Sequence, residues 1–195
     1  MPLPKTLYAA TQSCFFQEVI TNKVVGQMEK AASKVFTVSE AEKRSWEANV
    51  YKIKELLEGS GVTDTFIVFE YFLPFGLQRI DCMLLGKDAL ERDNVILIEL
   101  KQWSNQTVHC STAAGNFRIS PDSVSALTGG CWREVEHPSQ QVRGYCGYLQ
   151  NFIDVISKEN WVLTCILLRS WSKRLFEKIF IITIMFNRIY GRTTL

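Results

Sequence analysis

Three short segments of this 195-residue chain are almost entirely apolar, yet they carry a few charged residues. They cover 65–73, 80–85 and 95–100, and they are rich in β-branched, aromatic and long aliphatic side chains. Near-continuous apolar runs of this kind predict strands that are covered on both faces, as in an α/β protein. We therefore expect a central β-sheet flanked by helices.

The charged residues in these runs occupy particular positions. Asp81 lies inside the second run, Glu99 lies near the end of the third, and Lys101 directly follows the third run. A charge in a buried strand is costly unless it is paired or binds a metal ion. The 18-residue spacing from Asp81 to Glu99 fits two strands joined by a turn over 86–94, which would place the two carboxylates on neighbouring strands. Because residues two apart in a strand face the same way, Lys101 would lie beside Glu99.

Two carboxylates and a lysine in this arrangement suit metal-dependent hydrolysis of phosphodiester bonds. Mg²⁺ usually takes one or two carboxylates, together with water and substrate phosphate. We expect Asp81, Glu99 and the backbone carbonyl of Leu100 to bind Mg²⁺ (or Mn²⁺), and Lys101 to act at the attacking water. A competing interpretation is a salt-bridged patch in an inactive domain, in which Asp81 and Glu99 pair with Arg79 and Lys101.

A helix is predicted from Ser39 or Thr37 to about residue 58, where Gly59-Ser60-Gly61 is a stop signal. Its apolar residues recur at helical spacing and form one buried stripe: Trp46, Val50, Ile53 and Leu57. One turn earlier this stripe reaches Glu42, which we expect to point inward. The alternative is that Glu42 is a first-turn acid favoured by the helix dipole.

A second helix is predicted to begin at His137-Pro138-Ser139, because proline is favoured at the first helical position. Gln141 and Tyr145 are four residues apart, so they stack on one side of this helix. Ordinary packing explains this pair equally well. His137 lies one further step back on the same line, either as a cap residue or as a catalytic one.

The other segments carry less chemistry. Residues 1–37 predict short strands or helices, and 103–135 predict hairpins or a long loop with one short strand at 116–119. Two further strands are expected at 161–168 and 179–186. We expect one domain over 1–168, followed by an atypical basic and apolar tail over 169–195. The chain is either a stand-alone domain or a truncated or frameshifted piece of a larger protein, and the composition of the tail favours the second.

Composition limits the partners. The net charge is only +2, so nucleic-acid binding must come from local basic residues. The candidates for holding phosphates are Arg79, Lys87, Arg133 and Arg143. No GxxxxGK[ST] loop is present, and the apolar run at 179–186 is too short to span a bilayer.

The six cysteines show no CxxC pair, no zinc-type spacing and no tight cluster for an iron–sulfur centre. Because free cysteines are often buried, we expect reduced thiols and a cytoplasmic protein.

Together these motifs resemble the PD-(D/E)XK nuclease superfamily. Asp81 followed by Glu99-Leu100-Lys101 matches its signature, with Ile80 in place of the usual proline, and Gln141 with Tyr145 matches the QxxxY helix of RecB-type members. Three blocks are similar to the amino-terminal nuclease-like domain of bacterial proteins that carry a Schlafen-type helicase domain. They are Ser45-Trp46, Glu70 through Asp81, and Ile98 through Trp103 with His137-Pro138-Ser139.

The resemblance covers roughly residues 35–155 and implies a restriction-endonuclease-like core, with a mixed central β-sheet flanked by helices. It also implies that Glu42 joins the metal site, and that Gln141 and Tyr145 act at the site or contact the substrate backbone. The expected function is a metal-dependent nuclease acting on DNA, with RNA also open, and a helicase or ATPase as partner. The alternative is an inactive nucleic-acid-binding module that serves such a motor.

Overall fold

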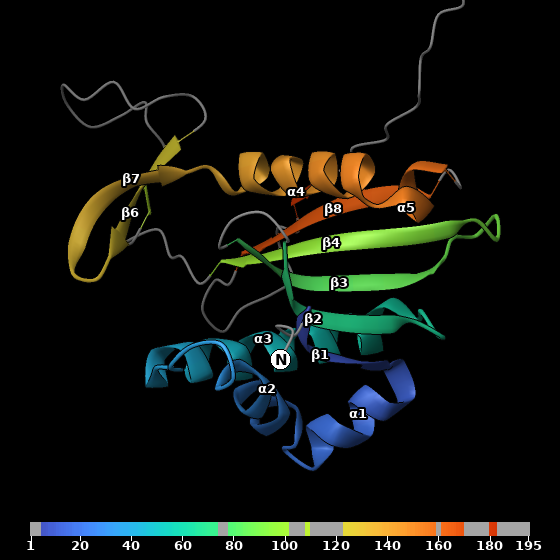
Figure 1. Ribbon diagram of the computed structural model, residues 1–195, viewed down its shortest axis with the longest axis horizontal. Coiled ribbons are helices and arrows are strands. Elements are labelled where there is room, and N and C mark those ends of the chain that lie inside the picture. The colour runs from blue at the N-terminus through green and yellow to red at the C-terminus, as the bar shows by residue number, and fades with distance from the viewer. Residues whose placement is uncertain are drawn as a thin grey trace, which may run out of the picture.

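The computed structural model describes residues 5–73, 78–101, 108–109, 123–158, 161–169 and 180–182. These residues form a sheet with helices on both faces, and a small second sheet beside it (Figure 1). The α/β class predicted from the apolar runs is therefore confirmed.

The main sheet has six strands in the spatial order β1-β2-β3-β4-β8-β9. They are β1 (Thr6–Thr11), β2 (Phe66–Phe72), β3 (Arg79–Lys87), β4 (Asp93–Lys101), β8 (Val162–Arg169) and β9 (Phe180–Ile182). The β4–β8 pair is parallel and the other pairs are antiparallel, so the sheet is mixed, as expected. Whether this core is of the restriction-endonuclease type stays a prediction.

The helices form two separate layers. One face of the sheet is covered by α1 (Gln12–Ile20), α2 (Val24–Ala32) and α3 (Glu40–Ser60), and the other by α4 (Pro138–Phe152) and α5 (Asp154–Lys158). In Figure 1 these are the blue helices below the strands and the orange helices above them. Each layer has its own apolar core, so both faces of the central strands are buried.

Helix α3 follows its sequence signals closely. The Ser39 hydroxyl accepts a hydrogen bond from the backbone N–H of Glu42 at 3.2 Å, which caps the first turn. Gly61, with φ 67°, ends the helix in the left-handed conformation that glycine adopts most readily. All four residues of the predicted stripe are buried: Trp46, Val50, Ile53 and Leu57. This packing fixes the face on which Glu42 points toward the sheet.

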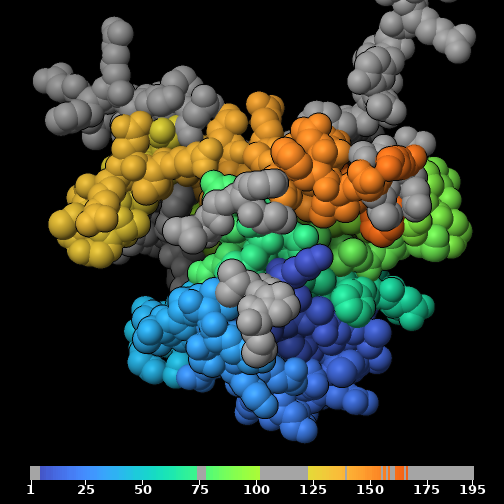
Figure 2. Space-filling view, in the orientation of Figure 1, coloured from blue at the N-terminus to red at the C-terminus, as the bar shows by residue number. Residues whose placement is uncertain are grey.

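The second sheet consists of β5 (Val108–His109), β6 (Ser123–Thr128) and β7 (Cys131–Glu136). The turn between β6 and β7 is Gly129-Gly130, and both glycines have positive φ. Figure 2 shows this hairpin, in yellow, projecting from the body of the molecule. Strand β7 leads directly into α4. The hairpins expected within 103–135 are thus confirmed, whereas the strand predicted at 116–119 lies outside the described residues.

Two other predictions concern the chain as a whole. In the part that the structure describes, no helix is long and apolar enough to cross a membrane. Phe180–Ile182 pairs with β8, and because most of 169–195 lies outside the described residues, the boundary at 168 stays a prediction.

The expectation of reduced cysteines holds for Cys14, Cys82 and Cys131, which carry free thiols. It is wrong for Cys146, which is disulfide-bonded. Sequence spacing reveals CxxC pairs but not cysteines that folding brings together from distant segments.

Candidate functional site

Strands β3 and β4 bring Asp81 and Glu99 together, as their spacing predicts. Cys82 pairs with Ile98, and the next residues along the two antiparallel strands are Asp81 and Glu99. The backbone N–H of Leu100 donates a hydrogen bond to Asp81 Oδ2 at 2.8 Å. Because the amide and carbonyl of one residue in a regular strand point to the same side, we expect the Leu100 carbonyl to face β3 as well.

Glu99 is the most unusual residue of this pair. Its side chain is buried, with 1% of the residue exposed. Lys101 Nζ lies 2.6 Å from Glu99 Oε1, which confirms that the two residues share one face of β4. Within the described part of the chain, Glu99 Oε2 has no hydrogen-bond partner although it is buried. Burial and the nearby charge of Asp81 raise the pKa of Glu99 to about 7.

The backbone beside Asp81 is irregular. Ile67 and Phe69 face the core under α1–α3, whereas Tyr71 packs on the α4 side, so the alternation of β2 is interrupted at Glu70. Strand β3 is interrupted in the same way between Ile80 and Cys82. Glu70 has φ 54°, which is rare for a residue of this size and costs about 1–3 kcal/mol.

Neither interruption shifts the register. Phe69 pairs with Cys82 and Tyr71 pairs with Ile80, so Glu70 lies opposite Asp81. The irregular backbone of both strands is therefore confined to the one cross-strand position that carries these two acids.

Glu70 is a second buried acid, and the sequence motifs do not identify it as a site residue. It is 5% exposed, and Arg79 Nε lies 3.2 Å from its Oε2. Burial raises the pKa of Glu70 to about 8, against the lowering effect of the Arg79 charge. The same guanidinium donates from Nη2 to Glu42 Oε1 at 2.7 Å. Glu42 thus points toward the sheet, as predicted, and contacts Arg79.

Helix α4 supplies the remaining predicted pair. Gln141 Nε2 donates a hydrogen bond to the Tyr145 hydroxyl at 2.5 Å, so the two side chains stack as their spacing predicts. Tyr145 is 2% exposed, and burial together with the charge of Glu99 raises its pKa. The charge of Glu136, at the end of β7, also acts on both Tyr145 and Glu99. The site therefore draws on β3, β4, α4 and the end of the hairpin.

The remaining residues predicted from the sequence are His137 and three basic residues, Lys87, Arg133 and Arg143. The His137 carbonyl accepts hydrogen bonds from the N–H groups of Gln140 and Gln141, as the residue before a helix does. Lys87, the last residue of β3, pairs with Asp93, the first residue of β4, at 3.1 Å, at the opposite end of those strands from the site. Arg133 and Arg143 are exposed, on β7 and α4.

The charge balance of the site favours a bound cation. Four of its acids lie on the sheet or the helices that flank it, and the fifth lies at the end of the hairpin: Glu42, Glu70, Asp81, Glu99 and Glu136. Among the described residues, Arg79 and Lys101 offset them, so the cluster would carry a net charge of −3 if all five acids were ionised. Because the pKa values of Glu99 and Glu70 are about 7 and 8, the cluster approaches this charge only above about pH 8. The unpartnered Glu99 Oε2 is a buried oxygen acceptor of the kind Mg²⁺ binds.

Among the described residues, no three His, Cys, Asp or Glu side chains converge as a ready-made metal cage. A site with two carboxylates and a backbone carbonyl suits Mg²⁺, which keeps several waters and binds through one or two carboxylates. The donor set around Asp81 and Glu99 is therefore compatible with this ion.

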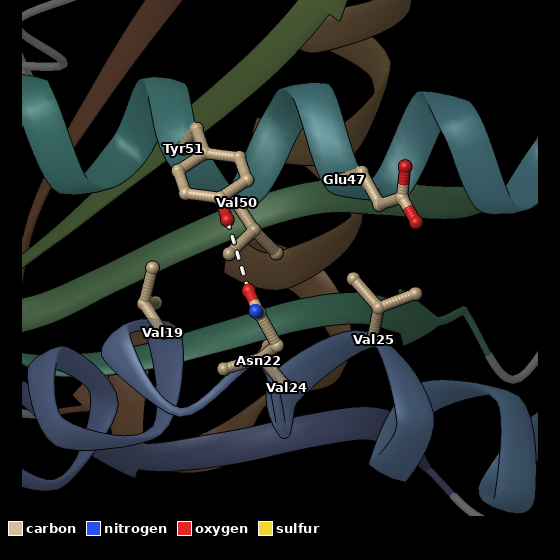
Figure 3. A pocket seen from close by; sticks show the side chains of 7 residues that line it. All are labelled: Val19, Asn22, Val24, Val25, Glu47, Val50 and Tyr51. Atoms are coloured by element: carbon tan, nitrogen blue, oxygen red, sulfur yellow. Dashed lines mark hydrogen bonds between the residues drawn. The ribbon is translucent and has the colours of Figure 1, made fainter.

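A groove of about 320 Å³ lies elsewhere, between the α1–α2 corner and α3 (Figure 3). Valines from these helices line it, and the Tyr51 hydroxyl donates to Asn22 Oδ1 at 3.0 Å across it. None of the predicted site residues lines this groove. The chemistry predicted from the sequence is thus concentrated at the sheet and not in this apolar depression.

The buried acids make the stability of the metal-free protein depend on pH. The folded-state pKa values of Glu99 and Glu70 are about 7 and 8, both above the ordinary value of 4.5. From about pH 4.5 up to these folded-state pKa values the folded protein binds more protons than the unfolded chain, so the free energy of unfolding falls as pH rises. The stabilisation that comes from protonated Glu99 and Glu70 is complete below about pH 4.5. It is lost as pH rises through about 7 for Glu99 and about 8 for Glu70.

Urea unfolding in EDTA between about pH 5 and 8 should show a fall of up to about 1.4 kcal/mol per pH unit for each titrating carboxyl. Glu99→Gln and Glu70→Gln should each make this slope shallower, whereas the exposed Glu55→Gln should not. Stability that is constant or rises over this range would contradict the assigned burial.

No protein-family model, curated protein or solved structure matches this chain.

Proposed function

We propose that this chain is a Mg²⁺-dependent nuclease of the RecB-type PD-(D/E)XK kind, acting on DNA. The observation that carries the proposal is the buried Glu99 Oε2, which has no partner among the described residues and belongs to β4, the neighbour of the strand that carries Asp81. A buried carboxylate oxygen without a hydrogen bond is costly unless a cation compensates it. The Lys101 amine, on the same face, adds the third element of the signature.

The carboxylates of Asp81 and Glu99 and the carbonyl of Leu100 are the proposed Mg²⁺ ligands, and Mn²⁺ is the expected substitute. When bound, the ion lowers the pKa of a coordinated water and neutralises charge on the phosphate. Asp81 is held for this task by the Leu100 amide. Glu42 was also predicted as a ligand; the structure describes it as paired with Arg79.

The chain's own groups supply the remaining functions. Lys101 is 23% exposed at its side chain and is anchored by Glu99, so its amine is positioned to stabilise developing negative charge or to orient a water. The Gln141–Tyr145 pair lies on α4, beside the charge of Glu99, where it suits a contact with the substrate backbone. A helicase or ATPase partner belongs to the same proposal, because it rests on the same resemblance.

The direct test is cleavage of single- and double-stranded DNA, and of RNA, with Mg²⁺ or Mn²⁺. We expect the wild type to cut DNA only with metal, and Asp81→Ala and Lys101→Ala to be inactive. Equal activity in all three proteins would exclude the assignment. Salt-dependent DNA binding without cleavage would instead favour the inactive binding module.

A further inference from the structure

Arg79 connects three elements around the proposed metal site. Its Nη2 lies 2.7 Å from Glu42 Oε1 on α3, and its Nε lies 3.2 Å from Glu70 Oε2 on β2. Arg79 itself belongs to β3, two residues before Asp81. One guanidinium therefore joins a helix and a neighbouring strand to β3 next to the point where this strand presents Asp81.

Aromatic contacts hold this guanidinium in place. Its central carbon lies 5.0 Å from the ring centroid of Phe36 and 5.8 Å from that of Phe72, its cross-strand partner. The planar group of arginine stacks on such rings while it donates hydrogen bonds in its own plane. With two acids and two rings around it, Arg79 is suited to a fixed position.

The backbone at Glu70 indicates what this arrangement maintains. Glu70 has φ 54° and lies opposite Asp81, where both strands depart from regular alternation. A left-handed residue of this size persists where its surroundings determine it. The side chain of Glu70 is held by Arg79, which also pairs with Glu42 on α3. The irregular backbone beside Asp81 is thus tied to α3 through partly buried polar contacts.

We infer that Glu42, Arg79 and Glu70, the Arg79 cluster, position Asp81, and that Glu42 acts through Arg79 and not as a metal ligand. This inference rests on the proposed function. One of the two Glu42 carboxylate oxygens, Oε1, already accepts a charge-assisted hydrogen bond from Arg79. A divalent cation that approached this oxygen would also meet the positive charge of the guanidinium.

A double-mutant cycle on the full chain separates a positioning role from a ligand role. The variants are Glu42→Gln, Arg79→Ala and both together, with the Mn²⁺ dissociation constant measured by titration calorimetry. Loss of a group that orients a ligand weakens metal binding by about 10–100-fold. We expect this loss in each single variant, and we expect the double variant to bind Mn²⁺ no more weakly than Arg79→Ala alone.

The spectrum of bound Mn²⁺ gives a second readout, which a general loss of stability would not change. At saturating Mn²⁺ the electron paramagnetic resonance spectrum of Glu42→Gln should match the wild type, whereas that of Asp81→Asn should differ. If Arg79→Ala does not fold, Arg79→Lys, which keeps the positive charge, takes its place in the double-mutant cycle. Arg92→Ala, which removes the Arg92–Asp88 ion pair at 2.7 Å on the β3–β4 turn, is the matched control and should bind Mn²⁺ normally.

Two results would overturn the inference. One is a further loss of tenfold or more when Glu42→Gln is added to Arg79→Ala, and the other is an altered Mn²⁺ spectrum in Glu42→Gln; either would make Glu42 a ligand. In either case, if the wild type binds Mn²⁺ and cuts DNA, the proposed function still holds. A wild type that neither binds Mn²⁺ nor cuts DNA removes the proposed function and this inference together.

Discussion

Replacing Lys101 by methionine is expected to lower the rate of metal-dependent DNA cleavage by about 10²–10⁴-fold without weakening Mn²⁺ binding. The Lys101 amine lies 2.6 Å from Glu99 Oε1, so it is fixed beside a proposed ligand without being one itself. Its loss removes a positive charge from the reacting region, and this should leave the affinity for a cation unchanged or higher.

Single-turnover cleavage and Mn²⁺ titration of the same preparations measure the two effects. Lys158→Met is the matched control, because Lys158 forms a similar pair with Asp154 on α5, at 2.7 Å, and takes no part in the site. Full activity of Lys101→Met would show that this amine does not act at the attacking water. Equal losses of activity and of Mn²⁺ affinity would show that it supports metal binding instead.

Glu99→Gln is expected to change stability and metal binding in opposite directions. At about pH 8 the Glu99 carboxyl, whose pKa is about 7, is mostly ionised although it is buried and has one oxygen without a partner in the described structure. A neutral side chain of the same shape removes this cost, so the metal-free variant should be roughly 1–3 kcal/mol more stable than the wild type. Mn²⁺ affinity should fall at least about tenfold, as for other changes close to a metal.

Urea unfolding in EDTA and calorimetric titration with Mn²⁺ measure the two quantities. Glu55→Gln, a neutralised acid on the exposed face of α3, should alter neither. A less stable Glu99→Gln protein with normal Mn²⁺ affinity would identify Glu99 as part of a structural ion pair with Lys101. That result would favour the salt-bridged patch over the metal site.

Local patterns in the sequence predict the parts of the site that depend on neighbouring residues. The period of α3 identifies the inward face of Glu42, and the two-residue repeat of β4 places Lys101 beside Glu99. The i, i+4 spacing on α4 brings Gln141 and Tyr145 into contact. In each case a single helix or strand determines the geometry, so its period is sufficient.

The contacts that the sequence did not reveal depend on long-range pairing. Glu70 reads as one polar residue in an apolar strand, and its role follows from the β2–β3 register and from a left-handed φ. Arg79 was predicted to hold phosphate because it is basic and lies near Asp81, but its guanidinium contacts two acids from other elements. The charge of Glu136 reaches the site only because the hairpin leads into α4.

A crystal structure of the full chain soaked with Mg²⁺ or Mn²⁺ tests the central claim most directly. The account predicts one ion bound by the Asp81 and Glu99 carboxylates and the Leu100 carbonyl, with Mg²⁺–oxygen distances of about 2.0–2.1 Å. It also predicts that Glu42 remains paired with Arg79 in that structure. The account would be contradicted by a soaked crystal in which no ion binds Glu99 Oε2 and Lys101 still provides the counter-charge of the Glu99 carboxylate.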